Sequence, residues 1–393
     1  MTRQPWPLGS LLLLCAGIFL SVTTELVPTG LLLSMSRDLS VSPAQIGLLV
    51  TGYAVMVALF AAPLGTLTAR LPRRLLLTAA LASYAVSNAV MIFAETYSIA
   101  VVARLIGGLT HGLFWAVLGG YAARLVSPER VGRAITIVSS GGAAAVLIGV
   151  PAGTSIGVAV GWRYTFAGLA VLGVVLALLA QRLPEVPGST AAVRTSLLEV
   201  VRLPGFPAIV ATTAVTMLGA FTFSTYTAPL LANAGLSEAQ IAPVLMCSGL
   251  AGTLMLPVTG WLVDRWLRQG MLTGAALMTG ALVLLSIGGR SAIVAIAAVT
   301  MSGLAMGLLP VLFQTATLRT APDHTEQASG VNASAFNVGI AGGATIGALT
   351  LDHVGIEAVP VVGAVLAATG LIVYLTAGRT KQPALGLGRA AGG

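Results

Sequence analysis

Long apolar stretches recur along the whole chain, with short polar intervals between them. Runs of about 20 apolar residues, the length at which a helix spans about 30 Å of hydrocarbon, occur twelve times. They cover residues 9–33, 44–69, 75–94, 97–122, 132–157, 163–182, 206–232, 240–263, 271–289, 292–316, 326–350 and 358–377. Barrel strands would instead alternate polar and apolar residues at every second position. The pattern therefore predicts an all-α membrane protein with twelve transmembrane helices.

The composition agrees with this prediction and excludes a soluble globule. Hydrophobic residues make up 56% of the chain and charged residues 8%, whereas soluble domains carry about 25% charged residues. We therefore expect the lipid bilayer to be the main surrounding. The formal net charge of +8 does not indicate a nucleic-acid partner, because the basic residues follow membrane topology and do not gather on one folded face.

Basic residues concentrate on one side of the predicted membrane. If the amino terminus is cytoplasmic, sixteen of the 20 Lys and Arg residues fall in cytoplasmic loops and tails. Arg37, Arg163 and Arg290 fall on the opposite side, and Arg104 lies within a span. Because positive charge is retained on the cytoplasmic side, this distribution predicts that both termini are cytoplasmic.

A polar stretch with three Pro and Gly residues, Pro184, Pro187 and Gly188, separates the first six spans from the last six. Such a stretch is typical of a linker. The expected organisation is a first six-helix bundle at 1–182, a cytoplasmic linker at 183–205, a second six-helix bundle at 206–378 and a cytoplasmic tail at 379–393.

The two halves share local patterns at matching places. The segment GTLTARLPRR after the second span recurs as GWLVDRWLRQG after the eighth. Glycines spaced four apart occur in the fifth span and again in the eleventh, at 149, 153 and 157 and at 339, 343 and 347. Internal duplication of this kind indicates two pseudo-symmetric bundles around a central transport path.

The duplicated halves and the loop motif resemble the major facilitator superfamily over essentially the whole chain. That family's loop signature is G-x-L-x-D-R-x-G-R-R, and here Ala69 replaces its Asp and Pro72 its second Gly. The residues that match in the first copy are Gly65, Leu67, Arg70, Arg73 and Arg74, and the second copy has Gly260, Asp264 and Arg265. In the family the Asp helps to lock the outward-facing state through a cytoplasmic charge network, which Ala69 cannot join.

Further segments resemble one branch of that family. Gly149, Pro151, Gly153 and Gly157 in the fifth span are similar to its antiporter motif, in which glycines permit close helix approach and proline bends the helix. The segment TELVPTGLL at 24–32, the stretch from Ala103 to Trp115, and Asn332, Phe336 and Asn337 resemble the sugar efflux and arabinose exporter branch of the drug:proton antiporters.

The resemblance implies a major facilitator fold and a proton-coupled antiporter in a bacterial inner membrane. It would export small molecules, such as sugars or amphenicols, by rocking its two bundles. A proton symporter that takes up a small polar solute stays open as the alternative, because sequence does not show coupling order or affinities. We expect a monomer, since one chain supplies both halves of the path.

Glu25, Arg104 and His111 are the ionisable residues that lie clearly inside spans. A charge at the bilayer centre costs at least about 2.5–3.5 kcal/mol, so such residues usually serve transport. Glu25 and Arg104 lie at similar depth, at about 1.5 Å per residue from the outer helix ends, and an ion pair between them is expected. His111 and Trp115 follow Arg104 at spacings of seven and four residues and therefore share its helix face.

Our hypothesis is that Glu25 exchanges the coupling proton and that Arg104 lowers its proton affinity until substrate or a conformational change separates the pair. His111 is the alternative proton carrier or a hydrogen-bonding group for substrate. The competing interpretation is structural: Glu25 and Arg104 hold two helices together, and His111 donates to a nearby carbonyl.

The second half has no charged residue in the helices expected to line the cavity, which suits neutral, hydroxyl-rich or amphipathic cargo. Expected substrate-binding residues are Glu25, His111, Trp115, Tyr226, Gln314, Asn332 and Asn337, with Gln45, Tyr53 and Phe223 as further candidates. The amides could instead join helices to one another. Three histidines without an H-E-x-x-H pattern, and the absence of a G-x-x-x-x-G-K-[ST] motif, argue against an enzyme, a metal site, a cofactor and ATP-driven transport.

Overall fold

The computed structural model describes residues 7–127, 130–188 and 197–377. Within these residues, twelve helical spans are long and apolar enough to cross a membrane, which confirms the number predicted. The spans of the first half are α1 (Leu8–Gly30), α3 (Pro43–Leu67), α4 (Arg73–Ile92), α5 (Tyr97–Arg124), the continuous run of α6 (Val131–Ala144), η2 (Ala145–Gly149) and α7 (Val150–Val160), and α8 (Trp162–Ala180). Those of the second half are α10 (Phe206–Ser224), α12 (Glu238–Arg265), α13 (Leu267–Gly288), α14 (Ala292–Thr320), α15 (Thr325–His353), preceded by η3 (Pro322–His324), and α16 (Ala358–Ala377).

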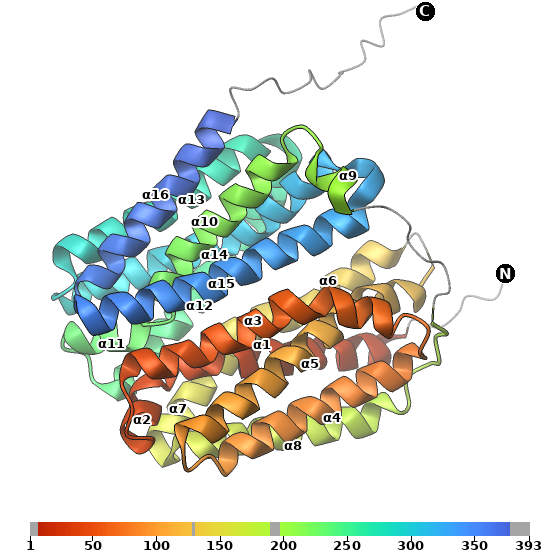
Figure 1. Ribbon diagram of the computed structural model, residues 1–393, viewed down its shortest axis with the longest axis horizontal. Helices are drawn as coiled ribbons and strands as arrows, with labels where there is room; N and C mark the ends of the chain where they lie inside the picture. The colour runs from red at the N-terminus through yellow and green to blue at the C-terminus, as the bar shows by residue number, and fades with distance from the viewer. Residues whose placement is uncertain (1–6, 128–129, 189–196, 378–393) are drawn as a thin grey trace, which may run out of the picture.

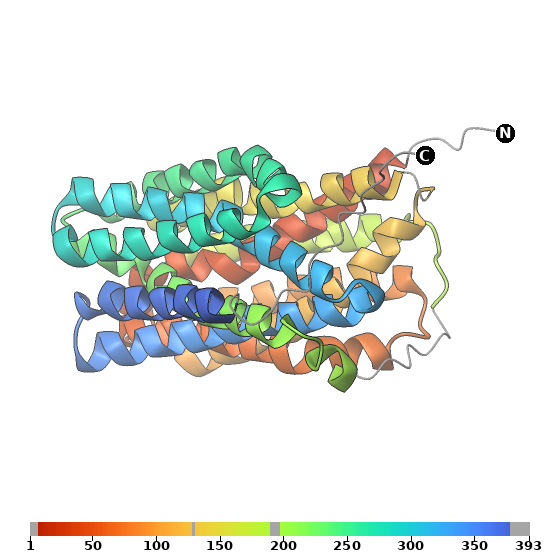
Figure 2. The ribbon, with the colours of Figure 1, turned by 90° about the horizontal axis from the view of Figure 1, so that it is seen from above.

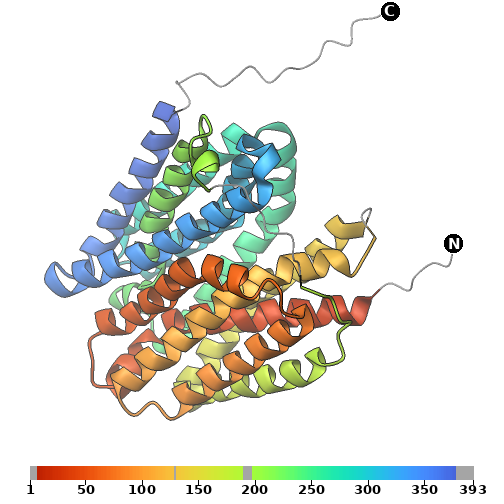
Figure 3. The same cartoon turned by 45° about the vertical axis from the view of Figure 1, so that its right-hand side comes forward.

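The helices form two bundles that lie side by side, α1 to α8 in one and α10 to α16 in the other (Figures 1 and 2). Two short helices, α2 (Leu32–Asp38) and α11 (Thr227–Asn233), lie at one end of the molecule, called here the α2/α11 end. The short helix α9 (Leu197–Val201) lies at the opposite end, called the α9 end (Figures 1 and 3). The predicted tail at 379–393 and residues 189–196 of the predicted linker lie outside the described residues.

Two spans predicted as single helices, 9–33 and 206–232, are interrupted near the α2/α11 end. The first breaks after Gly30 and resumes as α2, and the second breaks after Ser224 and resumes as α11. Pro229 lacks the N–H that would bond to the carbonyl of Thr225, which explains the second break. The apolar run continues through both breaks, so hydrophobicity alone could not reveal them.

The glycine stripe that runs from the end of η2 into α7 packs directly against α1. A Cβ atom on Gly149 would overlap the Thr23 hydroxyl, and one on Gly157 would overlap the Leu31 side chain. Gly153, between them, faces Val27. The second stripe, in α15, faces α10 in the same way. The duplicated glycines therefore have the same use in both halves, which is to let two backbones approach closely.

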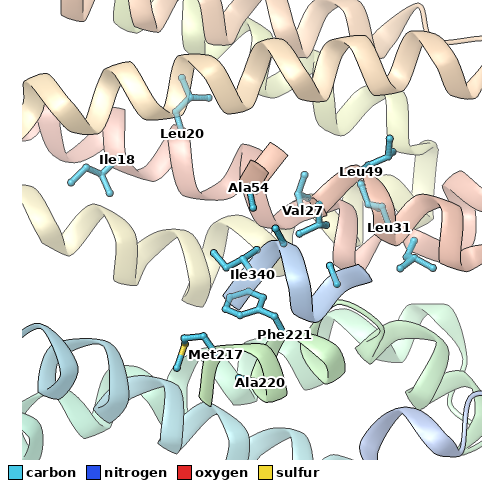
Figure 4. Close-up of a cluster of buried hydrophobic side chains, with 14 of the residues drawn as sticks. Ile18, Leu20, Val27, Leu31, Leu49, Ala54, Met217, Ala220, Phe221 and Ile340 are labelled. Carbon is cyan, nitrogen blue, oxygen red and sulfur yellow. The ribbon is translucent and has the colours of Figure 1, made fainter. Parts of the chain in front are cut away.

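The two bundles touch on the side of the α2/α11 end. Thr51 of α3 and Thr345 of α15 place their hydroxyl oxygens 3.1 Å apart, and Arg37 of α2 forms an ion pair with Glu238 of α12. Apolar side chains from α1, α3, α10 and α15 gather between the bundles (Figure 4). The middle of α12 also packs against the π-helical turn η2, where Gly249 meets the backbone of Val146.

Asp38 fixes the position of α2 against α8. The indole N–H of Trp162 donates to its carboxylate at 2.9 Å, and Arg163 forms an ion pair with it. The hydrogen bond from Arg163, followed by that from Trp162, holds the pKa of Asp38 below its usual value. Arg163 also donates to the carbonyl of Ala94 at 2.7 Å, so α2 is tied to the loop after α4 as well.

The first part of the linker docks onto the first bundle at the α9 end. The hydroxyl of Tyr121 donates to the Pro184 carbonyl at 2.6 Å, and Arg124 donates to the Pro187 carbonyl at 2.9 Å. Arg74 of the loop motif forms a 2.8 Å ion pair with Glu185. Glu185 of the linker thus supplies an acidic partner for Arg74 of the loop motif. Ala69, which replaces the motif's Asp, has no charge with which to do so.

Replacing Gly149 with Leu is expected to destabilise the protein, because the side chain would have to displace α1. Overpacking of this kind costs about 1–3 kcal/mol or more. The control is Gly168→Leu on α8, since Gly168 has no heavy atom within 4 Å of an added Cβ. Thermal unfolding in detergent should show a lower Tm for Gly149→Leu than for the control. Equal Tm values would contradict the packing role of this glycine.

Candidate functional site

The ionisable residues expected inside the spans come together in a buried polar cluster on four helices. Glu25 of α1 and Arg104 and His111 of α5 are 8%, 2% and 7% exposed. Ser21 of α1, Tyr53 of α3 and Tyr84 of α4 complete the set. The term polar cluster is used below for these six residues.

Arg104 does not pair with the Glu25 carboxylate, which corrects the expected contact. Its two terminal nitrogens instead donate to the backbone carbonyls of Thr24 at 2.6 Å and Glu25 at 2.8 Å. The Thr24 carbonyl is free because its helical partner would be the N–H of residue 28, and that residue is Pro28. Arg104 therefore satisfies a backbone acceptor that the α1 helix leaves unpaired.

The Glu25 carboxylate lies nearest to His111. Glu25 Oε2 is 3.8 Å from His111 Nε2, a distance at which the two groups interact electrostatically. The other ring nitrogen, Nδ1, lies 3.0 Å from Ser21 Oγ and 2.9 Å from the Tyr53 hydroxyl. The Ser21 hydroxyl in turn lies 2.6 Å from that of Tyr84. The imidazole is thus held between a carboxylate and a chain of hydroxyl groups.

His111 and Trp115 lie on one face of α5, as expected, and the Trp115 end of this face is accessible. The rings of His111 and Trp115 have centroids 5.8 Å apart. Trp115 is 43% exposed, so it carries the polar cluster toward the accessible surface on the side of the α9 end. Phe114, next to it, packs edge-on against both Tyr84 and the Trp115 ring.

In the second bundle, two of the expected substrate-binding amides bind each other. Asn332 of α15 donates to the Gln314 side chain of α14 at 2.8 Å. The Asn332 carbonyl oxygen accepts from Thr213 of α10 and from Thr317 of α14, both at 3.2 Å. Gln314 also donates to Ser329 at 2.8 Å. This network joins α10, α14 and α15, which is the arrangement expected if the amides join helices to one another.

Asn337 and Tyr226 are placed differently from that network. Asn337 donates to the Ala333 carbonyl of its own helix at 3.0 Å, and its buried Oδ1 has no hydrogen-bond partner among the described residues. Tyr226 is fully buried near the α2/α11 end, where its hydroxyl donates to the Ala344 carbonyl at 2.8 Å. Its ring fills the space beside Gly47 of α3 and Gly347 of α15, so it packs at the contact between the bundles.

Sequence reasoning did not rank Ser21, Tyr53 and Tyr84 among the central residues. Their only signal is a hydroxyl within an apolar run, which is common in membrane helices. Of the further candidates, Gln45 forms the capping box at the start of α3 with Ser42, and Phe223 is buried in α10. No group of three or more His, Cys, Asp or Glu residues that could hold a metal ion occurs in the described part of the chain.

Comparisons with known proteins agree on one family. The family model described as Major Facilitator Superfamily matches residues 13–333 and 209–391. A "probable sugar efflux transporter" of Mannheimia succiniciproducens is 31% identical over 364 residues, covering 91% of this chain and 90% of the relative. A "chloramphenicol efflux pump" of Mycobacterium tuberculosis is 33% identical over 374 residues, covering 90% of this chain and 89% of the relative.

Solved structures show the same fold. A bacterial homologue of the human lysosomal transporter Spinster, crystallised in an inward-facing and occupied conformation, superposes with a TM-score of 0.79 at 15% identity. The match covers 96% of this chain and 98% of that structure. The expected fold of two pseudo-symmetric six-helix bundles is thereby confirmed.

The two asparagines of α15 are expected to respond differently to replacement by Ala. Asn332→Ala removes three side-chain hydrogen bonds between helices, each worth about 0.6 kcal/mol on average in membrane proteins. Asn337→Ala, the matched control, removes a bond within one helix only. Thermal unfolding should therefore show a clear loss of stability for the first variant and little for the second. A reversed order would mean that the amide network does not hold the bundle together.

Proposed function

Because this chain belongs to the Major Facilitator Superfamily, we propose that it exports small molecules in exchange for protons by alternating access. The observation that carries the proposal is the buried Glu25 carboxylate, which faces His111. The Arg104 guanidinium donates to the backbone carbonyl of the same residue, Glu25. A carboxylate kept from solvent among hydrogen-bonding groups can hold a proton in one conformation and lose it in another. The names of the two curated relatives, a sugar efflux transporter and a chloramphenicol pump, support the direction of transport.

We propose that the protein lies in a bacterial inner membrane with both termini and the α9 end in the cytoplasm. Arg70, Arg74, Arg124 and Arg319 lie in or beside the loops at the α9 end, and the positive-inside rule supports this orientation. The α2/α11 end then faces outward. A single chain, divided at the linker of residues 183–205, supplies both bundles, so a monomer suffices for transport.

The contacts between the bundles support a conformation that is closed to the outside. Arg37 with Glu238, Thr51 with Thr345, and Tyr226 against Gly47 all lie on the outer side of the membrane in this orientation. Protons would reach Glu25 from outside when these contacts open, and would leave toward the cytoplasm past His111 and the exposed Trp115. One charge crossing 100 mV yields about 2.3 kcal/mol, enough for a gradient of about fortyfold.

For the cargo, we propose a neutral molecule with hydroxyl groups and an apolar face, the class that includes sugars and amphenicols. Trp115 offers an exposed aromatic face beside His111, and aromatic faces bind both sugar rings and aromatic drugs. The unpartnered Oδ1 of Asn337 is available to accept a hydrogen bond once the protein moves. Gln314 and Asn332 contribute less directly, because their amides are engaged with each other.

Glu25→Gln is expected to abolish proton-driven export, because the amide cannot exchange a proton. The assay is transport in proteoliposomes with an imposed pH gradient and an internal pH dye, screened with arabinose, lactose, nucleosides and amphenicols. Wild-type protein should move protons opposite to the cargo. Glu95→Gln, an exposed residue after α4, is the matched control and should behave as wild type. Uphill accumulation that persists in Glu25→Gln would sink the proposal, and protons moving with the cargo would indicate a symporter.

Gly47→Ala is expected to slow transport by more than tenfold, because the added methyl group would overlap the Tyr226 hydroxyl and prevent closure of the outer side. Tyr226→Ala in the same chain should restore part of the rate. Gly52→Ala is the control, since a Cβ there meets only a Leu105 side-chain atom at 3.5 Å. In a background that lacks Cys15 and Cys247, Thr345→Cys should react faster with an impermeant thiol reagent when Gly47→Ala is also present. An unchanged labelling rate would argue against the closed outer side.

A further inference from the structure

Tyr53 touches both basic neighbours of Glu25, Arg104 and His111. Its ring lies under the Arg104 guanidinium, with 4.2 Å from the guanidinium carbon to the ring centroid. Its hydroxyl oxygen lies 2.9 Å from His111 Nδ1, and the two rings meet edge to face at 5.4 Å and 75°. It comes from α3, whereas Glu25 lies on α1 and both Arg104 and His111 lie on α5.

The close approach of α3 and α5 is built around this tyrosine. Tyr53 is fully buried. A Cβ on Gly107 would lie 2.9 Å from its ring, and one on Gly108 would overlap its backbone carbonyl. The two adjacent glycines of α5 therefore leave the space that the Tyr53 ring and backbone occupy, so the ring has one well-defined position between its partners.

The Tyr53 hydroxyl acts on the tautomer of His111. A neutral imidazole carries one N–H, and the other ring nitrogen accepts. When a hydroxyl donates to Nδ1, the proton must lie on Nε2, the nitrogen that faces Glu25 Oε2 at 3.8 Å. The Glu25 carboxylate on the Nε2 side favours the tautomer with its proton on Nε2, which leaves Nδ1 as an acceptor. A hydroxyl that donates to Nδ1, from Tyr53 at 2.9 Å or Ser21 at 3.0 Å, stabilises that tautomer and with it the charged form of the carboxylate.

The Tyr53 ring, by contrast, disfavours the charged form of the Glu25 carboxylate, because it keeps Arg104 away from it. Attraction between a guanidinium and the face of an aromatic ring is strongest where water is absent. Held over the ring, Arg104 directs its terminal nitrogens to the carbonyls of Thr24 and Glu25 and not to the Glu25 carboxylate. Removing the ring frees the guanidinium to move toward that carboxylate.

We propose that Tyr53 is a positioning residue that sets the proton affinity of Glu25 through His111 and Arg104. This inference rests on the proposed function, in which Glu25 carries the coupling proton. Two titratable groups lie against His111, Glu25 on α1 and Tyr53 on α3. Tyr84 on α4 contacts Ser21, and Arg104 on α5 lies over the Tyr53 ring. Arg133 of α6 lies in the first turn of its helix, at the α9 end.

Two substitutions at this one position should move the pH dependence of transport in opposite directions. Tyr53→Phe keeps the ring over Arg104 but removes the hydroxyl at Nδ1, so Glu25 should keep its proton to higher pH. We expect the proton concentration at half-maximal transport to fall by about threefold, the effect of one interhelical hydrogen bond. Tyr53→Leu removes the ring as well, and the freed Arg104 should shift the profile toward lower pH.

The experiment measures proton-coupled transport in proteoliposomes over a range of pH for wild type, Tyr53→Phe and Tyr53→Leu. Adding Ser21→Ala to Tyr53→Phe should enlarge the alkaline shift, because Nδ1 then has neither hydroxyl. Tyr121→Phe is the control, because the Tyr121 hydroxyl donates to the Pro184 carbonyl, outside the polar cluster. A structural role alone would lower rates without moving the profile.

The outcomes separate this inference from the proposed function. If Glu25→Gln abolishes coupling but the Tyr53→Phe profile equals that of wild type, the inference is wrong and the proposed function stands. If both variants at Tyr53 shift the profile in the same direction, the role assigned to Arg104 is wrong. Should Tyr53→Leu fail to fold, the profile of Tyr53→Phe alone still decides the role of the hydroxyl. Coupling that survives in Glu25→Gln would overturn both proposals.

Discussion

The two hydrogen bonds that Arg104 donates to the α1 backbone are the interaction on which the rest of the site depends. Inside a membrane a helix must satisfy its own carbonyls, and Pro28 prevents this at Thr24. The guanidinium fills the gap and joins α5 to α1 at the depth of Glu25. The cation is thereby fixed beside the acid without a salt bridge to its carboxylate. The carboxylate is left to interact with His111, whose other ring nitrogen lies beside the hydroxyls of Ser21 and Tyr53.

Close contacts that involve the backbone also determine how the helices pack within each bundle. Glycines at every fourth position of α7 and α15 bring those helices close to α1 and α10. Side chains at the contact between the bundles are mostly small or apolar. The exceptions are Tyr226, a few hydroxyl groups and the solvent-accessible ion pair of Arg37 with Glu238. Contacts of this kind can separate without leaving a buried charge unpaired. Rigid bundles joined by such contacts are what an alternating mechanism requires.

Much of the fold followed from sequence, and less of the site did. The number of spans and the duplication could be predicted because a run of about 20 apolar residues has one stable form in lipid. Helix depth, counted along the chain, correctly placed Glu25 and Arg104 near each other. It could not show which atoms meet, because that depends on helix rotation and on the carbonyl freed by Pro28. The hydroxyls of Ser21 and Tyr84 were missed, and Tyr53 was only a further candidate, because nothing in a single apolar run distinguishes a site residue from an ordinary one.

The buried titratable acid and bases of the described residues, Glu25, Arg104 and His111, all belong to the first bundle. The second bundle contributes amides, hydroxyls and apolar surface in their place. Under the proposed function, the duplicated halves have diverged so that the first bundle carries the coupling proton and the second does not. Substitutions in α10 to α16 would then alter cargo recognition while leaving the proposed proton-coupling residues unchanged.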